Sequence, residues 1–306
     1  MPETENVIII GGGPAGLAAA IYNARANLNP LVLAGSPPGG QLMLTSDVEN
    51  YPGFESILGP ELIEKFRLHA KKFGTRIIDE NVLKVDFSKK PLEIYTSNKS
   101  YKTNTVIVAT GAKALWLNLP NEQRLRGKGV SACATCDAFF FKNKIVGVVG
   151  GGDTAMEEAL TLTKFANKVY IIHRRDQFRA SKIMQDRVRK NPKIETIWNT
   201  VVVDVLGEQK VEGIKLQKSQ ADSGQTRILQ LEGLFLAIGH KPDTDIFKGQ
   251  IEFDQKGYIV TKQSMTSVPG VFAAGDCVDH IYRQAGTAVG MGIAAALDVE
   301  KWLDQA

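Results

Sequence analysis

Cysteine is scarce in this sequence: only three occur in 306 residues. A disulfide-rich secreted scaffold needs several pairs, so that class is excluded and a reducing, cytoplasmic location is expected. Long apolar runs are also missing, because the longest one near the C-terminus, residues 288–297, is far shorter than the roughly 20 residues that span a bilayer. Acidic residues precede the first apolar stretch, where a signal peptide would need basic ones. We therefore expect no membrane segment.

Charge of one sign is not in large excess either. The chain has 37 Lys and Arg against 33 Asp and Glu, a formal charge of +4, and no basic run long enough to follow a nucleic-acid backbone. Nucleic acid is therefore not an expected partner. Glycine, in contrast, is abundant, with 29 residues in an otherwise ordinary globular composition. A length of 306 corresponds to two domains at about 150 residues each.

Part of this glycine lies in a motif near the N-terminus. An apolar strand at residues 7–10 runs into GGGPAG, in which Gly11, Gly13 and Gly16 fit G-x-G-x-x-G ahead of a predicted helix. Glycines there permit a tight turn, and the helix directs its N–H groups and positive dipole end toward a pyrophosphate. One such motif is weak, because a βα turn without a ligand has the same pattern.

The motif occurs again about 140 residues later. The strand at residues 144–149 leads into GGGDTA, where Gly150, Gly152 and Ala155 fit the G-x-G-x-x-A variant. Two strand–glycine–helix units predict two Rossmann-like modules and two nucleotides.

The end of the strand that follows each motif indicates which nucleotide binds. After the second motif, this position carries His173, Arg174 and Arg175, with Arg179 one helical turn further. Guanidinium groups pair bidentately with a phosphate dianion, so the second module is predicted to bind NADPH; a charged surface loop is the alternative. After the first motif the strand ends at Ala34 without an acid, which weakens a simple NAD assignment there.

The order of elements predicts an α/β protein in which the second module is inserted into the first. A third apolar strand, residues 270–276, ends in Asp276 ahead of a small-residue helix from about Arg283, where the acid and the helix start could meet a ribityl hydroxyl and a phosphate. The segments GAKAL and GHKPDT serve as the two crossing linkers. The expected domains are residues 1–113 with 243–306, and residues 114–242.

The cysteine pair Cys133 and Cys136 has the spacing Cys-x-x-Cys, which fits half a zinc site, a structural disulfide or a redox couple. Zinc is disfavoured, because the third cysteine and four scattered histidines provide no second paired spacing. A structural disulfide is disfavoured because so small a loop restrains the unfolded chain little. A redox couple is favoured, since a tight pair opens and closes without backbone movement.

Eight segments together resemble one family. The chain is similar to the low-molecular-weight thioredoxin reductases over essentially its whole length, in the order and approximate spacing of GGGPAG, GGQL, VENYPG, ATGA, CATCD, GGGDTA, HRRDQFRA and GVFAAGDCVDHIYRQA. The resemblance implies two Rossmann-like dinucleotide-binding domains, with the NADPH domain inserted into the FAD domain. It also implies a homodimer and thioredoxin as protein substrate.

The resemblance further implies a route for electrons. NADPH reduces the flavin, the flavin opens the Cys133–Cys136 disulfide, and the dithiol reduces thioredoxin. Cys136 would face the flavin, Cys133 would attack the partner, and Asp137 would supply a proton to the departing thiolate. The NADPH module would rotate about its two linkers between the half-reactions.

The expected site residues form two sets, and no metal is expected. The FAD set is Gly11, Gly13, Pro14, Ala15, Gly16, Ala34, Gly35, Gly39, Gly40, Gln41, Asn50, Val82, Ala109, Thr110, Gly111, Asp276, Arg283, Gln284 and Ala285. The NADPH set is Gly151, Gly152, Asp153, Thr154, Glu157, His173, Arg174, Arg175, Arg179, Ile238 and Gly239.

Three competing functions are weighed against this one. The flavoprotein of an alkyl hydroperoxide reductase has an extra N-terminal thioredoxin-like part, which a chain whose motif starts at Gly11 lacks. A flavin-dependent dithiol oxidase would not need the arginine cluster, and a redox sensor would not need the dithiol. Two further expectations are that Cys277 is a small buried filler rather than a reactive thiol, and that Phe139–Phe141 pack in the core.

Overall fold

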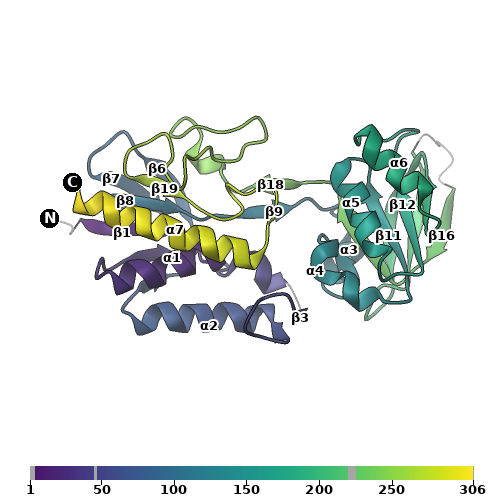
Figure 1. Ribbon diagram of the computed structural model, residues 1–306, viewed down its shortest axis with the longest axis horizontal. Helices are drawn as coiled ribbons and strands as arrows, with labels where there is room; N and C mark the ends of the chain where they lie inside the picture. The colour runs from purple at the N-terminus through teal and green to yellow at the C-terminus, as the bar shows by residue number, and fades with distance from the viewer. Residues whose placement is uncertain (1–3, 45–46, 220–224, 306) are drawn as a thin grey trace. The chain divides into compact units, whose positions relative to one another are not determined.

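The computed structural model describes residues 4–44, 47–219 and 225–305. The chain forms two compact units: residues 1–113 with 241–306 make the first, and residues 114–240 make the second (Figure 1). Where the chain crosses between them, the short strands β9 (Ala112–Ala114) and β18 (His240–Pro242) pair with each other. The predicted boundary at residue 242 lies two residues beyond the one seen here, at residue 240.

A seven-stranded sheet forms the centre of the first unit, in the order β5-β2-β1-β8-β7-β6, with β19 also paired to β8. Parallel pairing joins β1, β2, β5, β8 and β19, whereas β6 and β7 are antiparallel. A separate hairpin joins β3 to β4. The strands are β1 (Glu5–Ile10), β2 (Leu31–Leu33), β3 (Asp47–Val48), β4 (Ile57–Leu58), β5 (Arg76–Ile78), β6 (Val82–Asp86), β7 (Leu92–Thr96), β8 (Ser100–Val108) and β19 (Val271–Ala273).

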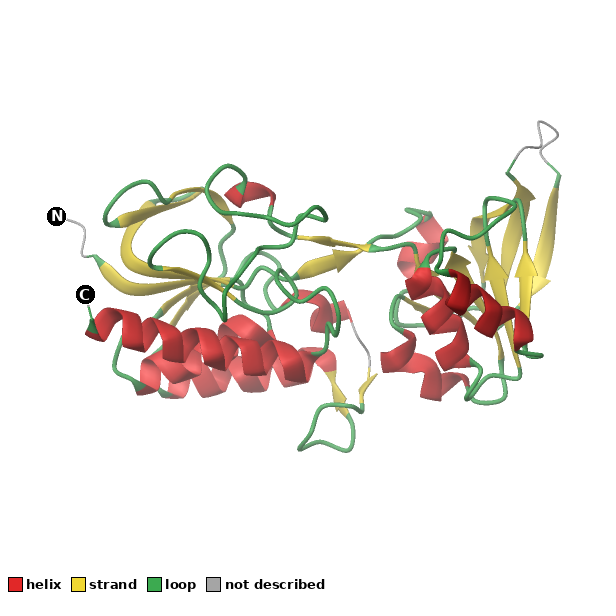
Figure 2. Ribbon diagram, turned by 45° about the horizontal axis from the view of Figure 1, so that its top comes forward, coloured by secondary structure: helices red, strands yellow, loops and turns green. Residues whose placement is uncertain are grey.

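Helices cover one face of this sheet. They are α1 (Pro14–Arg25), α2 (Gly59–Lys72) and α7 (Ala285–Asp304), and Figure 2 shows α1 and α7 side by side. Pro14 suits the first turn of α1, because its missing N–H would have no helical partner there. At Gly292 on α7, a Cβ would lie 2.1 Å from the carbonyl oxygen of Ala15, so α1 and α7 meet through their backbones. Their apolar side chains join those of the sheet in one buried cluster.

The other face of the sheet carries the second core cluster of this unit. It contains β6, β7 and the segment around the 3-10 helix η3 (Asp245–Phe247), with Phe87 stacked on Phe247 at 6.1 Å between ring centroids. Cys277 belongs to this cluster and is fully buried, with its sulfur 3.3 Å from the carbonyl oxygen of Ala274. Burial raises the pKa of the Cys277 thiol to about 11. The predicted burial of Cys277 is confirmed.

The second unit has a five-stranded parallel sheet, in the order β10-β17-β11-β12-β13, and a three-stranded antiparallel sheet, β14-β15-β16. The antiparallel sheet was not predicted. The parallel strands are β10 (Val130–Ser131), β11 (Ile145–Gly150), β12 (Lys168–Ile172), β13 (Ile194–Ile197) and β17 (Gly233–Ala237); the others are β14 (Thr200–Leu206), β15 (Gly213–Lys218) and β16 (Thr226–Gln230). The helices are α3 (Pro120–Arg124), α4 (Ala134–Asp137), α5 (Asp153–Leu162) and α6 (Lys182–Lys190).

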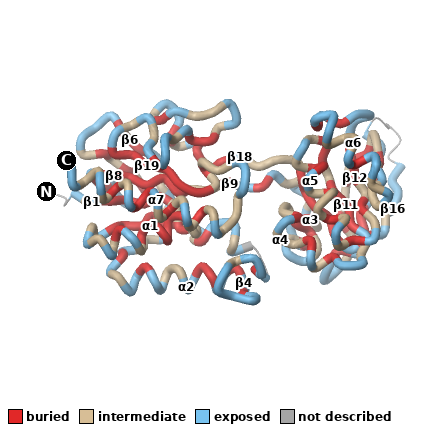
Figure 3. The backbone as a smooth tube through the Cα atoms, in the orientation of Figure 1, coloured by how far each residue is buried: buried red, intermediate tan, exposed pale blue. Residues whose placement is uncertain are grey.

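Two sheets, each with parallel strands at its centre and packed with helices, confirm the predicted α/β class, and the strands that carry the glycine turns, β1 and β11, are largely buried (Figure 3). The prediction for the three phenylalanines is only partly right. Phe141 is buried with its ring edge against Phe235, whereas Phe139 is 59% exposed. They lie in the 3-10 helix η2 (Ala138–Phe141), whose three residues per turn direct successive side chains to different sides.

Candidate functional site

The first glycine turn follows β1 and is held tightly to its neighbours. The N–H of Gly11 donates to the carbonyl oxygen of Leu33 at 2.9 Å. Gly11 has φ of +124°, and a Cβ there would lie 2.1 Å from the carbonyl oxygen of Ala109. Only glycine fits such a position. The turn that ends at α1 is therefore fixed by β2 and β8 together.

The start of α1 is suited to an anionic ligand. Gly13 is its N-cap, no side chain of the described residues caps the helix, and a Cβ at Gly13 would meet nothing within 4 Å. The first N–H groups of a helix need acceptors, and a pyrophosphate supplies them. The residues present therefore fit the dinucleotide predicted for this turn.

Predicted FAD residues from distant segments come together in this unit. A Cβ at Gly40 would lie 3.8 Å from the Cα of Gly13, so the loop that leads into η1 (Gly40–Leu44) lies against the first turn. Asn50 donates from its side-chain amide to the Gln284 side-chain oxygen at 3.3 Å. Gln284 is the N-cap of α7 and forms a capping box with Thr287. The VENYPG segment and the start of the last helix thus share one side-chain contact.

Asp276 follows β19 and stands beside the same turn. A Cβ at the preceding Gly275 would lie 2.9 Å from the Ala15 side chain. Burial raises the pKa of Asp276 to about 6; the neighbouring Asp279 adds to the rise and Arg283 opposes it. Hydroxyl donors would favour the ionised form of such a carboxyl group. Asp276 therefore fits the ribityl contact predicted for it.

Other predicted FAD residues occupy less direct positions. Ala34 is buried, and a Cβ at Gly12 would lie 2.6 Å from its Cβ, so it supports the turn from behind. Val82 begins β6 and packs against the core. A residue that the sequence did not single out is Asn81, whose side-chain oxygen accepts from the N–H of Ser36 at 2.9 Å. Asn81 holds the loop after β2, and its only sequence signal is an amide just before a strand.

The second glycine turn repeats the arrangement in the second unit. Gly152 is the N-cap of α5, no side chain of the described residues caps that helix, and a Cβ at Gly152 would meet nothing within 4 Å. At Gly150, a Cβ would lie 2.5 Å from the carbonyl oxygen of Ala237. This turn therefore fits a second dinucleotide by the same criteria.

A cavity of about 330 Å³ lies against this turn. Its lining includes Gly151, Ile238 and the three arginines Arg174, Arg175 and Arg179. The N–H of Arg179 donates to the carbonyl oxygen of Gly151 at 2.7 Å, which ties the basic loop to the glycine turn. The structure thus brings the arginines that can donate to a phosphate close to the helix start, although the two are about 25 residues apart in the sequence.

His173 lines the cavity differently from the arginines. Its ring is buried, with Nε2 3.1 Å from the carbonyl oxygen of Gln177, and a Cβ at Gly151 would lie 2.2 Å from it. Burial lowers the pKa of His173, so its imidazole is neutral near pH 7. His173 is therefore a spacer that shapes the turn and adds no positive charge to the arginine cluster.

Several predicted NADPH residues do not line the cavity: Gly152, Asp153, Thr154, Glu157 and Gly239. Asp153 accepts from both the N–H and the hydroxyl of Ser181, at 2.9 and 2.7 Å, and these bonds lower its pKa. It therefore anchors the start of α6. Ser181 itself was missed, since nothing in the sequence links it to a residue 28 positions earlier.

The cysteine pair lies at the start of α4. Cys133 and Cys136 form a disulfide, with 5.3 Å between their Cα atoms. The N–H of Cys136 donates to the Cys133 sulfur at 3.2 Å. Ser131, which ends β10, donates from its hydroxyl to the Asp137 carboxylate at 2.5 Å. Burial raises the pKa of Asp137, and the Ser131 hydrogen bond opposes the rise. Asp137 is thus a carboxyl group suited to hold and release a proton beside a disulfide.

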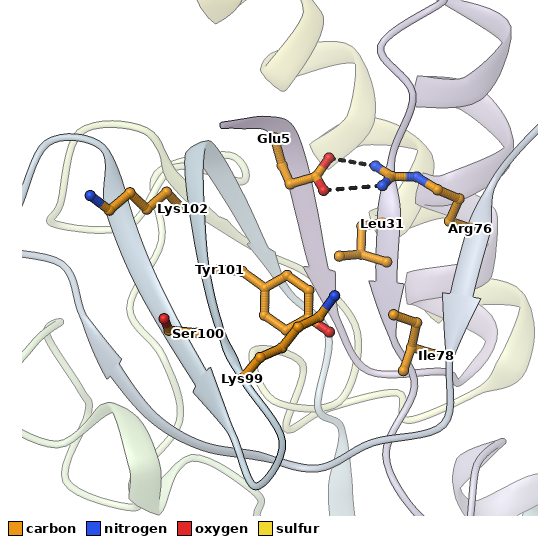
Figure 4. Close-up of a pocket in the computed structure, with 8 residues that line it drawn as sticks. All are labelled: Glu5, Leu31, Arg76, Ile78, Lys99, Ser100, Tyr101 and Lys102. Atoms are coloured by element: carbon orange, nitrogen blue, oxygen red, sulfur yellow. Dashed lines mark hydrogen bonds and ion pairs between the residues drawn. The ribbon is translucent and has the colours of Figure 1, made fainter. Parts of the chain in front are cut away.

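A second cavity, of about 230 Å³, lies at the amino ends of strands in the first unit (Figure 4). Ligands of parallel sheets bind at the carboxyl ends of the strands, and the glycine turns lie at that edge. This cavity lies at the opposite edge and is therefore outside the candidate site. Three of its four charged groups have partners inside it: Arg76 pairs with Glu5, and the Lys99 nitrogen lies 4.6 Å from the Tyr101 ring centroid.

Searches of residues 4–44, 47–219 and 225–305 for two other kinds of site found none. No three His, Cys, Asp or Glu side chains among them are grouped as metal ligands would be. No helix in these ranges is both long and apolar enough to pass through a membrane. Because Cys133 and Cys136 are bonded to each other, they are not the half zinc site that their spacing allowed.

Comparison with known proteins identifies the family. Residues 5–292 match the pyridine nucleotide-disulphide oxidoreductase family. Thioredoxin reductase of Rickettsia felis is 54% identical over the full length of both chains, and that of Streptomyces clavuligerus is 50% identical over 99% of this chain and 95% of its own. The crystal structure of thioredoxin reductase from Streptococcus pyogenes superposes with a TM-score of 0.95, at 41% identity over all of both chains. The chain therefore belongs to the pyridine nucleotide-disulphide oxidoreductase family and, within it, to the thioredoxin reductases.

Proposed function

We propose that this chain reduces the disulfide of thioredoxin at the expense of NADPH, with FAD in the first unit and NADPH in the second. Family membership makes the chain an oxidoreductase that uses FAD and NADPH. One observation supports the assignment of NADPH to the second unit: that unit has an arginine-lined cavity at a glycine turn, together with the Cys133–Cys136 disulfide. The first unit has the other helix that starts at a glycine turn without a side-chain cap, and the half-buried Asp276.

Bound NADPH supplies a hydride, and bound FAD turns it into an electron pair for a disulfide. The chain's own residues hold these groups and handle the proton. The N–H groups at the start of α1 and the Asp276 carboxylate would hold FAD, while Arg174, Arg175 and Arg179 would hold the 2′-phosphate. Cys136 receives electrons, and Cys133 attacks the partner's disulfide. Asp137 delivers a proton to the departing thiolate.

Both the dithiol and the NADPH cavity belong to the second unit, and both must reach a flavin held by the first. We therefore include rotation of the second unit about β9 and β18 between the half-reactions. An engineered disulfide that locks the two units should stop multiple turnover with thioredoxin and leave one half-reaction intact. Full multiple turnover in an enzyme whose cross-link is verified by mass spectrometry would show that rotation is not needed.

The finer statements about partners and location belong to the same proposal. Thioredoxin is the protein substrate, the enzyme works as a homodimer in the cytoplasm, and neither nucleic acid nor membrane is a partner. The 306-residue chain has a mass of 33.4 kDa, so light scattering separates a monomer from a dimer of about twice that mass. A monomer at working concentrations would contradict the dimer assignment.

One assay tests the proposed function. The purified yellow protein is mixed with thioredoxin, and the oxidation of NADPH is compared with that of NADH. Thioredoxin-dependent loss of NADPH is expected. Oxygen consumption with a dithiol but no NADPH requirement would indicate a dithiol oxidase. The absence of any turnover would indicate a sensor, and either result would contradict the proposal.

The arginine pair should determine the preference for NADPH. Arg174→Ala together with Arg175→Ala removes two charged donors from the cavity, and such hydrogen bonds contribute about 1.5–3 kcal/mol each. We expect the ratio of kcat/KM for NADPH over NADH to fall at least about 10-fold. Arg189→Ala is the matched control, because Arg189 bonds to Gln185 on α6 and does not line the cavity. An unchanged ratio in the double variant would place the 2′-phosphate elsewhere.

A further inference from the structure

Ser131 contacts both the cysteine loop and the acid, although the electron path described above makes no use of it. The N–H of Cys133 donates to the Ser131 hydroxyl oxygen at 3.0 Å, and that hydroxyl donates to Oδ2 of Asp137 at 2.5 Å. The Cys133 carbonyl oxygen, at 3.5 Å, is a much poorer acceptor. A hydroxyl has one hydrogen, so that of Ser131 is directed to Asp137.

The serine is a fixed point in the second unit. It is 8% exposed and ends β10, where it pairs in register with Phe235 of the fully buried strand β17. Asp137, in contrast, ends the four-residue helix α4, which is too short to be rigid alone. The hydrogen bond therefore ties the carboxyl group to the sheet and not merely to its own turn.

We propose that Ser131 is a positioning residue of the reduction step, which holds the Asp137 carboxyl group in the orientation from which it protonates the departing thiolate. The inference rests on the proposed function in one respect, the role of Asp137 as proton donor.

The proposed step balances as follows. When two electrons, which bound FAD would supply, enter the Cys133–Cys136 bond, the S–S bond breaks and two thiolates result. Asp137 gives its proton to one of them, which leaves one thiol, one thiolate and one carboxylate. Because Ser131 occupies Oδ2, the proton is carried on Oδ1. The bond from Ser131 strengthens when the carboxylate forms, since a charged acceptor binds a hydroxyl more strongly, so Ser131 favours release of the proton.

The electrostatic surroundings agree with this role. Burial raises the pKa of Asp137, and only the Ser131 bond opposes the rise. The elements packed against α4 are η2, which has no charged residue, and α5, which has Asp153, Glu157 and Glu158. None of these three carboxyl groups contributes to the shift. Removing the Ser131 hydroxyl therefore raises the Asp137 pKa further, and the acid then retains its proton to higher pH.

Thiol alkylation tests the inference without thioredoxin. The flavin-loaded enzyme is reduced with dithiothreitol, desalted anaerobically and treated with iodoacetamide from pH 5 to 9, and the labelled peptides are quantified by mass spectrometry. We expect an inflection in the rate for the peptide with Cys133 and Cys136 that Asp137→Asn removes. In Ser131→Ala this inflection should move up by about half a pH unit or more, and in Ser131→Thr, which keeps the hydroxyl, it should stay in place.

Two results would overturn the inference: a Ser131→Ala profile that superimposes on wild type, or a wild-type profile without an inflection that depends on Asp137. Ser131→Gly gives the same comparison if the alanine variant does not accumulate. Failure of the wild-type enzyme to reduce thioredoxin would contradict the proposed function but leave the alkylation result valid. The two failures are thus distinguishable.

Discussion

Replacing Cys136 by serine is expected to lower the rate of thioredoxin reduction by at least about 10³-fold, the size of effect seen when a covalent catalytic group is removed. The disulfide that joins Cys133 to Cys136 cannot form in this variant, so no electron pair can be stored on the second unit. Reduction of the flavin by NADPH should persist, because the arginine-lined cavity does not include either cysteine. Anaerobic bleaching of the yellow colour and thioredoxin-dependent turnover are measured separately.

Cys277→Ala is the matched control for this substitution. Cys277 is the remaining cysteine, fully buried in the core of the first unit, and its thiol has a raised pKa. Its removal should cost some stability and leave turnover within about 3-fold of wild type. If thioredoxin reduction survives in Cys136→Ser, or is abolished in Cys277→Ala, then the assignment of Cys133 and Cys136 as the redox thiols is wrong.

Gly292→Ala should be the most destabilising single substitution on α7. The added Cβ would lie 2.1 Å from the carbonyl oxygen of Ala15, a backbone atom that cannot rotate away, so α1 and α7 must separate. We expect a loss of at least about 3 kcal/mol of unfolding free energy, and a fall in Tm of about 6–10 °C. Because α1 also begins at the first glycine turn, the purified variant should contain less FAD than wild type.

Gly290→Ala is made on the same helix as the control. A Cβ there would meet nothing within 4 Å, so the substitution should stabilise the helix by about 0.5–1 kcal/mol through helix propensity alone. Differential scanning calorimetry and the ratio of flavin to protein absorbance are recorded for both. Equal melting temperatures for the two variants would mean that the helices adjust without cost.

Most of the fold that surrounds the nucleotides could be predicted from local patterns. The glycine turns have fixed spacing, and the strands before them are continuous apolar runs, as expected for strands buried on both faces. The antiparallel sheet β14-β15-β16 could not be predicted in this way, since it depends on pairing between segments that do not share a motif. Helix α6 was missed because it is polar, with only Val188 buried.

In the candidate site, too, some features could be predicted from the sequence and others could not. Residue types that bind phosphate were evident from the sequence, as was the cysteine pair. The partners that hold them were not: Ser181 anchors Asp153, Asn81 holds Ser36, and burial makes His173 neutral. Each depends on how a loop folds back onto a distant turn, and no spacing rule encodes that. Exposure of Phe139 depends similarly on the 3-10 geometry of a single turn.

The paired crossing strands have a consequence for how this protein can be rebuilt. The N–H of Leu115 donates to the carbonyl oxygen of Gly239 at 2.9 Å, and the N–H of Asp243 donates to that of Gly111 at 2.9 Å. The two ends of the inserted segment therefore lie side by side, one hydrogen-bonded pair of strands apart. Residues 114–240 can be cut out, and a homologous domain or a short turn joined in their place, with little strain on the chain that remains.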